Sequence, residues 1–330
     1  MNYLDIVRGQ PDNLAWSGAA VRAALASGVL PGPAASGPVV FTGMGASLAA
    51  AAAAAHVLDR AGTSALARTA GGLPGSGTLA AASVVVAASN TGRSPETVAV
   101  LEEAGHSRIL VSNDPKSPAA ALADLVVLLG SGEPDPVAAL SYTATVQALG
   151  LVAEALGAPA APWDRLPDLA RRVLAEADES ATRVAERWSS VTMVDVVGPG
   201  GGDATPREAA LLLREAARLP ASAYDTYEYL HGPVESAEPG IGCVVIGAGR
   251  EVALARALAE AGAEVLLLTT AAVPDTGGLT VVALPTAPEP ASTVLEILPV
   301  QLVAARLAAE RDIPVGTFRR PQQDTKVGAR

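Results

Sequence analysis

Residues 89–94 bring together side chains that suit the binding of a phosphate group. They read Ser-Asn-Thr-Gly-Arg-Ser, follow an apolar run and precede a proline that could open a helix. A phosphate dianion needs several donors at once; Ser89, Thr91 and Ser94 offer hydroxyl groups, and Asn90 offers an amide. The sequence therefore predicts a phosphate site at a helix N-terminus, where backbone N–H groups favour an anion. The alternative for Ser94 alone is that it only caps the helix.

A second loop, Gly-Met-Gly-Ala-Ser at residues 43–47, adds the Ser47 hydroxyl to the same prediction. Its first two glycines resemble the start of a dinucleotide-binding fingerprint. However, Leu48 stands where the third glycine is needed, and no acidic residue ends the next strand. The lysine of a phosphate-binding P-loop is missing as well. We therefore expect no nicotinamide, no other cofactor and no metal ion.

Two carboxylates and one histidine are the candidates for acid–base chemistry. The segment Thr-Pro-Arg-Glu at residues 205–208 is typical of a capping box and predicts a helix over residues 206–219. Glu208 and Glu215 lie seven residues apart and would share one face of it, as a site or as a solvated stripe. His231 precedes a Gly-Pro break, and imidazole titrates near neutrality.

These candidates must be positioned by strands and helices, which alternate along the chain. We expect strands at residues 38–41, 83–88, 108–111, 125–129, 192–197, 242–246, 264–269 and 279–284. We expect helices up to residue 60 and at residues 96–104, 141–156, 166–187, 206–219, 251–261 and 293–311. Such alternation predicts parallel sheets that are covered by helices on both faces.

The same order of elements occurs twice, which predicts an α/β protein of two tandem doubly wound parallel-sheet domains. The first domain would span residues 1–164 with an N-terminal helix and the phosphate site. The second would span residues 165–330 with a linking helix and the C-terminal tail. Ligands of such sheets bind beyond the carboxyl ends of the strands. Because the second copy has Gly-Ala-Gly-Arg at residues 247–250 in place of the hydroxyl-rich loop, we expect one phosphate site per chain.

Composition excludes several other classes of protein. The 330 residues carry 34 acidic and 23 basic side chains, a net charge of −11 with no basic block, which argues against nucleic acid as a partner. The longest apolar run, residues 48–58, is shorter than the roughly 20 residues of a membrane span. A single cysteine, Cys243, and a start without signal-peptide character favour the reducing cytoplasm.

Four segments together resemble the double sugar-isomerase (SIS) domain family, which includes the isomerase region of glutamine:fructose-6-phosphate amidotransferase and stand-alone amino-sugar-phosphate deaminase/isomerases. The segments are Gly-Met-Gly-Ala-Ser at 43–47, Ser-Asn-Thr-Gly-Arg-Ser-Pro-Glu-Thr at 89–97, Glu-Ala-Ala-Leu-Leu-Leu-Arg-Glu at 208–215 and Tyr-Leu-His-Gly-Pro at 229–233. The resemblance covers nearly the whole chain. It implies two flavodoxin-like SIS domains.

The resemblance also implies a role for each matched position. The phosphate-binding positions are Ser47, Ser89, Asn90, Thr91 and Ser94. The sugar-binding positions are Gly45, Val137 and Glu208. The catalytic positions are Glu215, which would move a proton between C1 and C2, His231, which would open the sugar ring, and Lys326, which would meet the open-chain carbonyl. In the family the histidine typically reaches into the partner subunit's site, which implies a homodimer with shared active sites.

Three departures from the family bear on the substrate. Leu212 replaces a lysine on the glutamate helix, and Ala-Leu-Ser at residues 139–141 stands where Ser-Thr-Lys is usual. No glutaminase domain precedes the first unit, so we do not expect glutamine-dependent synthesis.

The resulting hypothesis is an amino-sugar 6-phosphate deaminase/isomerase of the glucosamine-6-phosphate type, which acts by enediol proton transfer on a hexose or hexosamine 6-phosphate. A ketosamine-6-phosphate deglycase or an aldose–ketose isomerase would use the same proton relay. A non-catalytic sugar-phosphate sensor is a third alternative. A sensor would have no use for the set of Glu215, His231 and Lys326.

Overall fold

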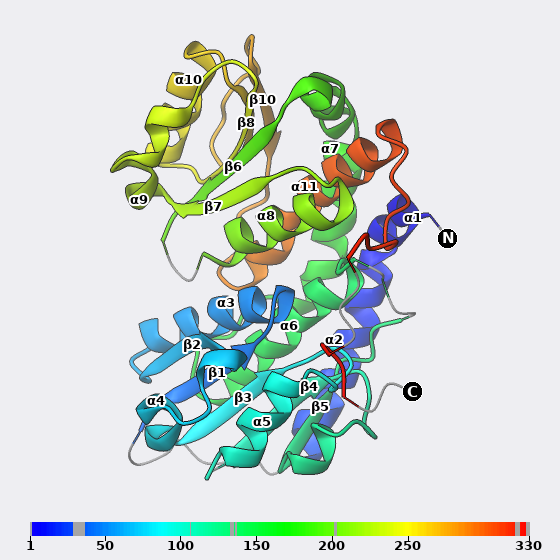
Figure 1. The fold of residues 1–330 in the computed structure, drawn as a ribbon, viewed down its shortest axis with the longest axis vertical. Coiled ribbons are helices and arrows are strands. Elements are labelled where there is room, and N and C mark those ends of the chain that lie inside the picture. Colours follow the sequence, from blue (N-terminus) through cyan, green and yellow to red (C-terminus); the bar gives the residue numbers. More distant parts are fainter. Residues whose placement is uncertain are drawn as a thin grey trace.

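Two five-stranded sheets form the framework of the molecule (Figure 1). The computed structural model describes residues 2–28, 37–105, 107–132, 135, 137–200, 203–320 and 324–327. The first sheet contains β1 (Val39–Gly43), β2 (Ala65–Thr69), β3 (Val84–Ala88), β4 (Ser107–Ser112) and β5 (Leu125–Leu128). The second contains β6 (Met193–Gly198), β7 (Ala221–Asp225), β8 (Ile241–Ile246), β9 (Glu264–Thr269) and β10 (Leu279–Ala283).

The two sheets repeat one topology. The first has the order β2-β1-β3-β4-β5, and the second, read from its β7 edge, has the order β7-β6-β8-β9-β10. Every strand pair within them is parallel. The predicted fold class of two tandem doubly wound α/β units is therefore confirmed.

The inner strands are buried on both faces, as parallel sheets require. All five residues of β1 and of β3 are buried, and their sequences, Val-Val-Phe-Thr-Gly and Val-Val-Val-Ala-Ala, are nearly continuous apolar runs. The sequence analysis missed β2 and β7, which are the edge strands next to β1 and β6. Both are short and half-exposed with polar residues such as Arg68 and Asp225, so they lack the apolar run that marked the other strands.

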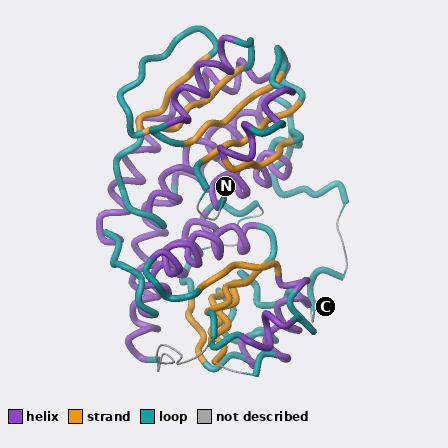
Figure 2. The backbone as a smooth tube through the Cα atoms, turned by 90° about the vertical axis from the view of Figure 1, so that its left-hand side faces the viewer, coloured by secondary structure: helices purple, strands orange, loops and turns teal. Residues whose placement is uncertain are grey.

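Eleven helices of the described residues surround the sheets. They are α1 (Tyr3–Arg8), α2 (Gln10–Ser27), α3 (Ala46–Arg60), α4 (Gly77–Ala81), α5 (Pro95–Glu103), α6 (Leu140–Ala155), α7 (Leu166–Arg187), α8 (Ala204–Ala216), α9 (Thr226–Leu230), α10 (Arg250–Glu260) and α11 (Ala291–Glu310). Figure 2 shows the sheets at opposite ends of the molecule with helices between them.

One hydrophobic core joins the two units. It runs from the inner face of the first sheet through α3, α6, α7, α8 and α11 to the inner face of the second sheet. Separate, smaller cores lie under α5 on the far face of the first sheet and under α10 on the far face of the second. The helical layer therefore fixes α8 of the second unit directly against α3 of the first.

The closing helix α11 is the one helix of the described chain that is long and apolar enough to cross a bilayer. It is mostly buried and packs against α7 and α8 at the centre of the joint core. Burial on all sides explains its apolar composition, because a helix that is hydrophobic all round is a core helix or a membrane span.

The start of α8 differs from the prediction. The helix begins at Ala204, and Asp203 before it has a left-handed conformation without a side-chain capping bond. Thr205 lies inside the helix, and its hydroxyl donates to Glu296 at 2.5 Å. Glu208 is 1% exposed and turned into the interior. The capping-box interpretation was therefore wrong. In such a box the Glu208 carboxylate would have to accept the backbone N–H of Thr205, whereas Glu208 is buried and Thr205 lies inside the helix.

Candidate active site

The loop of residues 89–94 joins the carboxyl end of β3 to the N-terminus of α5. Ser89 and Ser94 are buried, and their hydroxyl oxygens lie 3.5 Å apart. Although Ser94 is the N-cap residue of α5, its side chain accepts no capping bond. The hydroxyl of Thr91 is buried without a partner among the described residues. The unpaired Thr91 hydroxyl and the absence of a capping bond at Ser94 favour a ligand-binding role over simple helix capping.

Two backbone hydrogen bonds to neighbouring segments and one glycine fix the shape of this loop. The Asn113 N–H donates to the carbonyl of Asn90 at 3.0 Å, and the Ala119 N–H donates to the carbonyl of Gly92 at 3.1 Å. Gly92 has φ of +59°, and a Cβ atom there would lie 2.0 Å from the Ser117 hydroxyl oxygen. Only glycine fits this position, so the loop is fixed before any ligand arrives.

Ser47 approaches the loop from the neighbouring strand. It lies in the first turn of α3, directly after β1, and Gly45 makes the turn with φ of +53°. Because β1 and β3 are adjacent and parallel, both loops leave the same edge of the sheet. The structure thus brings together all five predicted phosphate-binding residues in the lining of one cavity of about 550 Å³.

The C-terminal segment also contributes to this cavity, through Phe318, Thr325 and Lys326. Residues 324–327 lie near the N-terminus of α5 (Figure 1). The Val327 N–H donates to the carbonyl of Arg93 at 2.8 Å, and the Lys326 ammonium donates to the Ser94 hydroxyl at 3.4 Å. Burial lowers the pKa of Lys326, against the opposing charge of Glu96. A larger fraction of neutral amine makes Lys326 a better nucleophile toward a carbonyl.

Glu215 lies on the wall of the cavity contributed by α8. Burial raises the pKa of its carboxyl group. Glu215 and Lys326 line the same cavity as the five predicted phosphate-binding residues, although they are supplied by the other half of the chain. A carboxylate and an amine at one site can move a proton and engage a carbonyl.

Glu208 and Val137 do not line the cavity. Each is 1% exposed, so their predicted contacts with the sugar stay predictions. Glu208 lies behind the cavity wall near Tyr142, whose pKa is raised by burial and then by the charge of Glu208. Burial, with the charges of Glu215 and Asp135, also raises the pKa of Glu208 well above its usual range.

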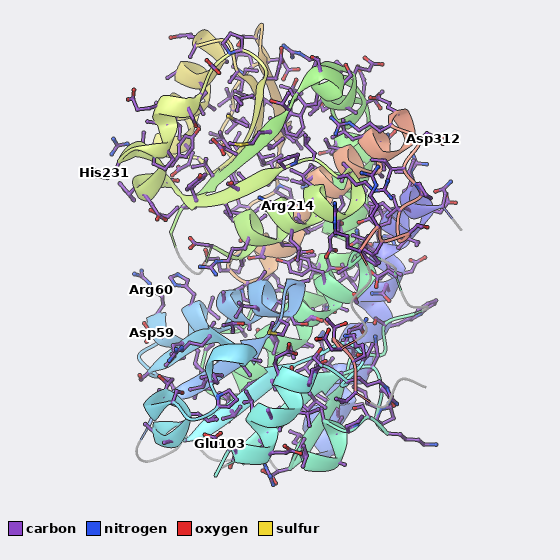
Figure 3. The ribbon with its side chains drawn as sticks, in the orientation of Figure 1. Asp59, Arg60, Glu103, Arg214, His231 and Asp312 are labelled. Carbon is purple, nitrogen blue, oxygen red and sulfur yellow. The ribbon has the colours of Figure 1, made fainter. Side chains whose placement is uncertain are left out.

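His231 lies elsewhere in the chain. It is exposed at the end of α9 and is absent from the cavity lining. Figure 3 shows it at the outer edge of the second domain, well apart from Arg214, the neighbour of Glu215 on α8. Within one chain His231 does not reach the cavity, and its predicted role as a partner-subunit residue is left as a prediction.

Several lining residues were missed by the sequence analysis. They are Met44, Asp135, Ala138, Ser141, Tyr142, Thr145, Leu211, Phe318 and Thr325. Asp135 accepts the backbone N–H of Ser141 at 3.1 Å and that of Ala139, and so holds the start of α6. An acidic residue before a predicted helix is a usable signal for such a cap. The others carry no pattern that separates them from core positions.

No family model matches the chain. Two curated relatives are glutamine–fructose-6-phosphate aminotransferases. The protein of Pyrobaculum aerophilum is 28% identical over 247 residues, 69% of this chain and 41% of that protein. The protein of Aeropyrum pernix is 30% identical over 179 residues, 49% of this chain and 29% of that protein. The matches thus span less than half the length of these relatives.

Solved structures share the fold over almost the whole chain. The C-terminal domain of glucosamine-fructose-6-phosphate aminotransferase from Francisella tularensis has a TM-score of 0.79 at 17% identity, over 96% of this chain and 98% of that one. Glucosamine-6-phosphate deaminase from Thermotoga maritima has a TM-score of 0.76 at 18% identity, over 97% of this chain and 98% of that one. Tagatose-6-phosphate ketose/aldose isomerase from Escherichia coli has a TM-score of 0.76 at 16% identity, over 98% of both chains.

Proposed function

We propose that this chain, a double SIS-domain protein, is a phosphosugar-converting enzyme, and most specifically an amino-sugar 6-phosphate deaminase/isomerase. One observation carries the proposal. The serine and threonine hydroxyls of the 89–94 loop, the Glu215 carboxyl and the Lys326 amine line a single cavity of about 550 Å³. A phosphate anchor, a base and a carbonyl-directed amine are what this chemistry requires.

The proposed reaction starts from an open-chain 2-amino-2-deoxyaldose 6-phosphate. Glu215 as carboxylate removes the proton from C2, the electron pair forms the C1–C2 double bond of an enaminol, and the C1 oxygen takes a proton from water. The same carboxyl group returns the proton to C1, which leaves an imine at C2 as the nitrogen gives a proton back to water. Water adds to that imine and ammonia departs, so the products are a ketose 6-phosphate and ammonia. Burial of Glu215 supports the relay, because a raised pKa brings a carboxyl group closer to neutral operating pH.

The two halves of the chain would supply different residues of this proposed site. Residues 1–164 supply the phosphate site, and residues 165–330 supply Glu215 and the tail with Lys326. Lys326 lies against Ser94 and would polarise or capture the open-chain carbonyl. His231, exposed on its own chain, would open the sugar ring in the site of a partner subunit. The reducing cytoplasm is the compartment in which hexose 6-phosphates would meet the enzyme.

The direct test is release of ammonia from glucosamine 6-phosphate by the purified protein. We expect ammonia and fructose 6-phosphate in equal amounts, and loss of both in Glu215→Gln. Glu235→Gln is the control for the same change of residue type, because Glu235 is an exposed glutamate outside the cavity lining. Absence of ammonia with every hexosamine 6-phosphate would reject the deaminase, while aldose–ketose interconversion without ammonia would indicate the plain isomerase.

A further inference from the structure

Asp195 is an acidic residue in the middle of an apolar strand. It interrupts β6, which reads Met-Val-Asp-Val-Val-Gly, and it is 1% exposed. One of its carboxyl oxygens has no hydrogen-bond partner among the described residues. Acidic side chains are almost never fully buried unless they are paired, because removal of a carboxyl group from water costs free energy. Packing of the core alone therefore does not explain an acid at this position.

The other carboxyl oxygen of Asp195 accepts the hydroxyl of Tyr229 at 3.1 Å. Tyr229 is fully buried in the core under α10, and its ring centre lies 5.3 Å from that of Tyr224 on β7. Cys243 is the neighbour of Asp195 across the sheet, on β8, and belongs to the same core. The Tyr229–Asp195 bond thus ties α9 to the sheet from inside a largely apolar core.

Tyr229 precedes His231 by two residues, and His231 is the C-cap residue of α9. A helix of five residues is too short to be stable by itself in water, so contacts with the rest of the chain must hold it. At its start, the Asp225 carboxylate accepts the N–H groups of Tyr227 and Glu228 at 2.8 and 3.2 Å. Near its end, the fully buried Tyr229 is the anchor, where α9 lies against β6 and β7 (Figure 1).

A hydrogen bond fixes α9 more sharply than apolar packing can. Apolar burial is non-directional, whereas a hydrogen bond sets both a distance and an angle. The bond to Asp195 therefore fixes how far Tyr229 enters the core and how α9 is rotated about its axis. Because His231 is exposed at the end of the same short helix, that rotation decides where its imidazole points.

We propose that Asp195 and Tyr229 are positioning residues, whose hydrogen bond aims His231 away from its own chain and into the active site of a partner subunit. Neither residue lines the cavity of the candidate active site, so both act only through His231. This inference rests on the proposed ring-opening role of His231 and deepens it. The acid inside β6 then gives precision to α9 and not stability to the core.

Stability measurements separate positioning from a merely structural role. Tyr229→Phe leaves the Asp195 carboxyl buried without a partner and should lower Tm. Asp195→Val combined with Tyr229→Phe replaces both partners by apolar groups, which is close to neutral or stabilising, so this double variant should have a Tm near that of wild type. Its kcat/KM for glucosamine 6-phosphate should nevertheless be low, as in Tyr229→Phe. Wild-type kcat/KM in the double variant would overturn the inference.

The kinetic test compares two neighbouring tyrosines. We expect Tyr229→Phe to lower kcat/KM for glucosamine 6-phosphate about ten- to a hundredfold, because a small misplacement of a catalytic group is that costly. Tyr224→Phe is the matched control and should keep wild-type kcat/KM, because the Tyr224 ring packs on that of Tyr229 but its hydroxyl is not part of the bond. Equal kcat/KM values for the two variants would overturn the inference.

The conservative variant Asp195→Asn should rescue the position of His231. Its amide oxygen can still accept the Tyr229 hydroxyl, and burial already raises the pKa of the Asp195 carboxyl group, so a neutral amide is a close substitute. Asp195→Asn should therefore keep most of the kcat/KM that Tyr229→Phe loses. A loss in Asp195→Asn as large as that in Tyr229→Phe would contradict the role of the bond.

Hybrid dimers show in which subunit the defect acts. A chain with Tyr229→Phe keeps its own cavity intact, so after mixing and reassembly with Glu215→Gln this cavity should receive a correctly placed His231 from the other chain. Activity should rise to about a quarter of wild type, because half of the dimers carry one such site. Recovery in the mixture of His231→Ala with Glu215→Gln, but not in this one, would overturn the positioning role alone. No recovery in either mixture would overturn the proposed role of His231 and this inference with it.

Discussion

At the scale of single residues, two threonines with buried hydroxyl groups, at the 89–94 loop and in α5, can separate a role in ligand binding from a role in packing. Thr91 and Thr97 both have buried hydroxyls without a partner among the described residues, but only Thr91 lines the cavity. Thr91→Val should raise the KM for a hexosamine 6-phosphate about ten- to a hundredfold, since a hydrogen bond to a charged group contributes roughly 1.5–3 kcal/mol. Thr97→Val is the matched control and should leave the KM at the wild-type value. A similar KM for both variants would place the phosphate elsewhere.

The raised pKa of Glu215 predicts a shifted acidic limb in the pH profile. The carboxylate is the active form, so kcat/KM should fall as pH decreases through a pKa above the ordinary glutamate value of about 4.3. The substrate phosphate also titrates, with a second pKa near 6. The pH dependence of substrate binding to Glu215→Gln should report the titration of the substrate phosphate alone. The acidic limb caused by Glu215 should be missing from it. A limb at or below the ordinary glutamate value would contradict the assignment.

Residue types predicted part of this site and missed part of it. Ser89, Thr91 and Ser94, which line the cavity, were predicted because donors are concentrated in one short loop after a strand. The clustering of Arg214, Arg218, Arg319 and Arg320 around a neighbouring cavity was not predicted, because these residues come from the end of α8 and from the segment after α11, more than a hundred positions apart. Only the packing of α11 against α8 brings such distant residues together.

At the scale of elements, the turn from β3 to α5 depends on Gly92. Its positive φ and the 2.0 Å approach of a Cβ atom to Ser117 predict that Gly92→Ala destabilises the fold by about 1–3 kcal/mol and weakens phosphate binding. Gly77→Ala in α4 meets no atom within 4 Å and should be neutral or stabilise by up to about 1 kcal/mol. Urea unfolding of the two variants measures the difference. Equal stability would mean that the loop relaxes freely.

Patterns of apolar residues predicted the buried elements and failed at the edges. The bounds of α7 and β9 agree with the prediction, because one helix is strongly amphipathic and the strand is buried. The edge strands β2 and β7 have no such pattern and are held by pairing to β1 and β6. The start of α8 depended on where Glu208 is buried, which is a tertiary property that local sequence does not contain.

At the scale of the whole molecule, the site exists because the two units are packed as one body. The first unit supplies the loop of residues 89–94, and the second supplies Glu215 and Lys326, which lies beside Ser94. His231 is the one proposed catalytic residue outside this cavity, so its role requires a second chain. Catalysis would therefore require the association of two chains.

Hybrid dimers test that requirement. Glu215→Gln and His231→Ala should each be inactive alone. If sites are shared across a two-fold interface, mixing and reassembling the two should restore about a quarter of wild-type activity, because half of the dimers are hybrids with one intact site each. Size-exclusion chromatography would verify that both variants remain dimeric. Activity of His231→Ala alone, or no recovery in the mixture, would remove His231 from the site.

The most direct test of the central claim follows the proton that Glu215 is proposed to move. Fructose 6-phosphate incubated with the protein in D2O should acquire deuterium at C1, detected by NMR, and Glu215→Gln should abolish this exchange while Glu235→Gln preserves it. The readout does not depend on which group leaves C1 or C2. Exchange at the wild-type rate in Glu215→Gln would contradict the account, and so would the absence of exchange in wild-type protein with every hexose 6-phosphate and hexosamine 6-phosphate.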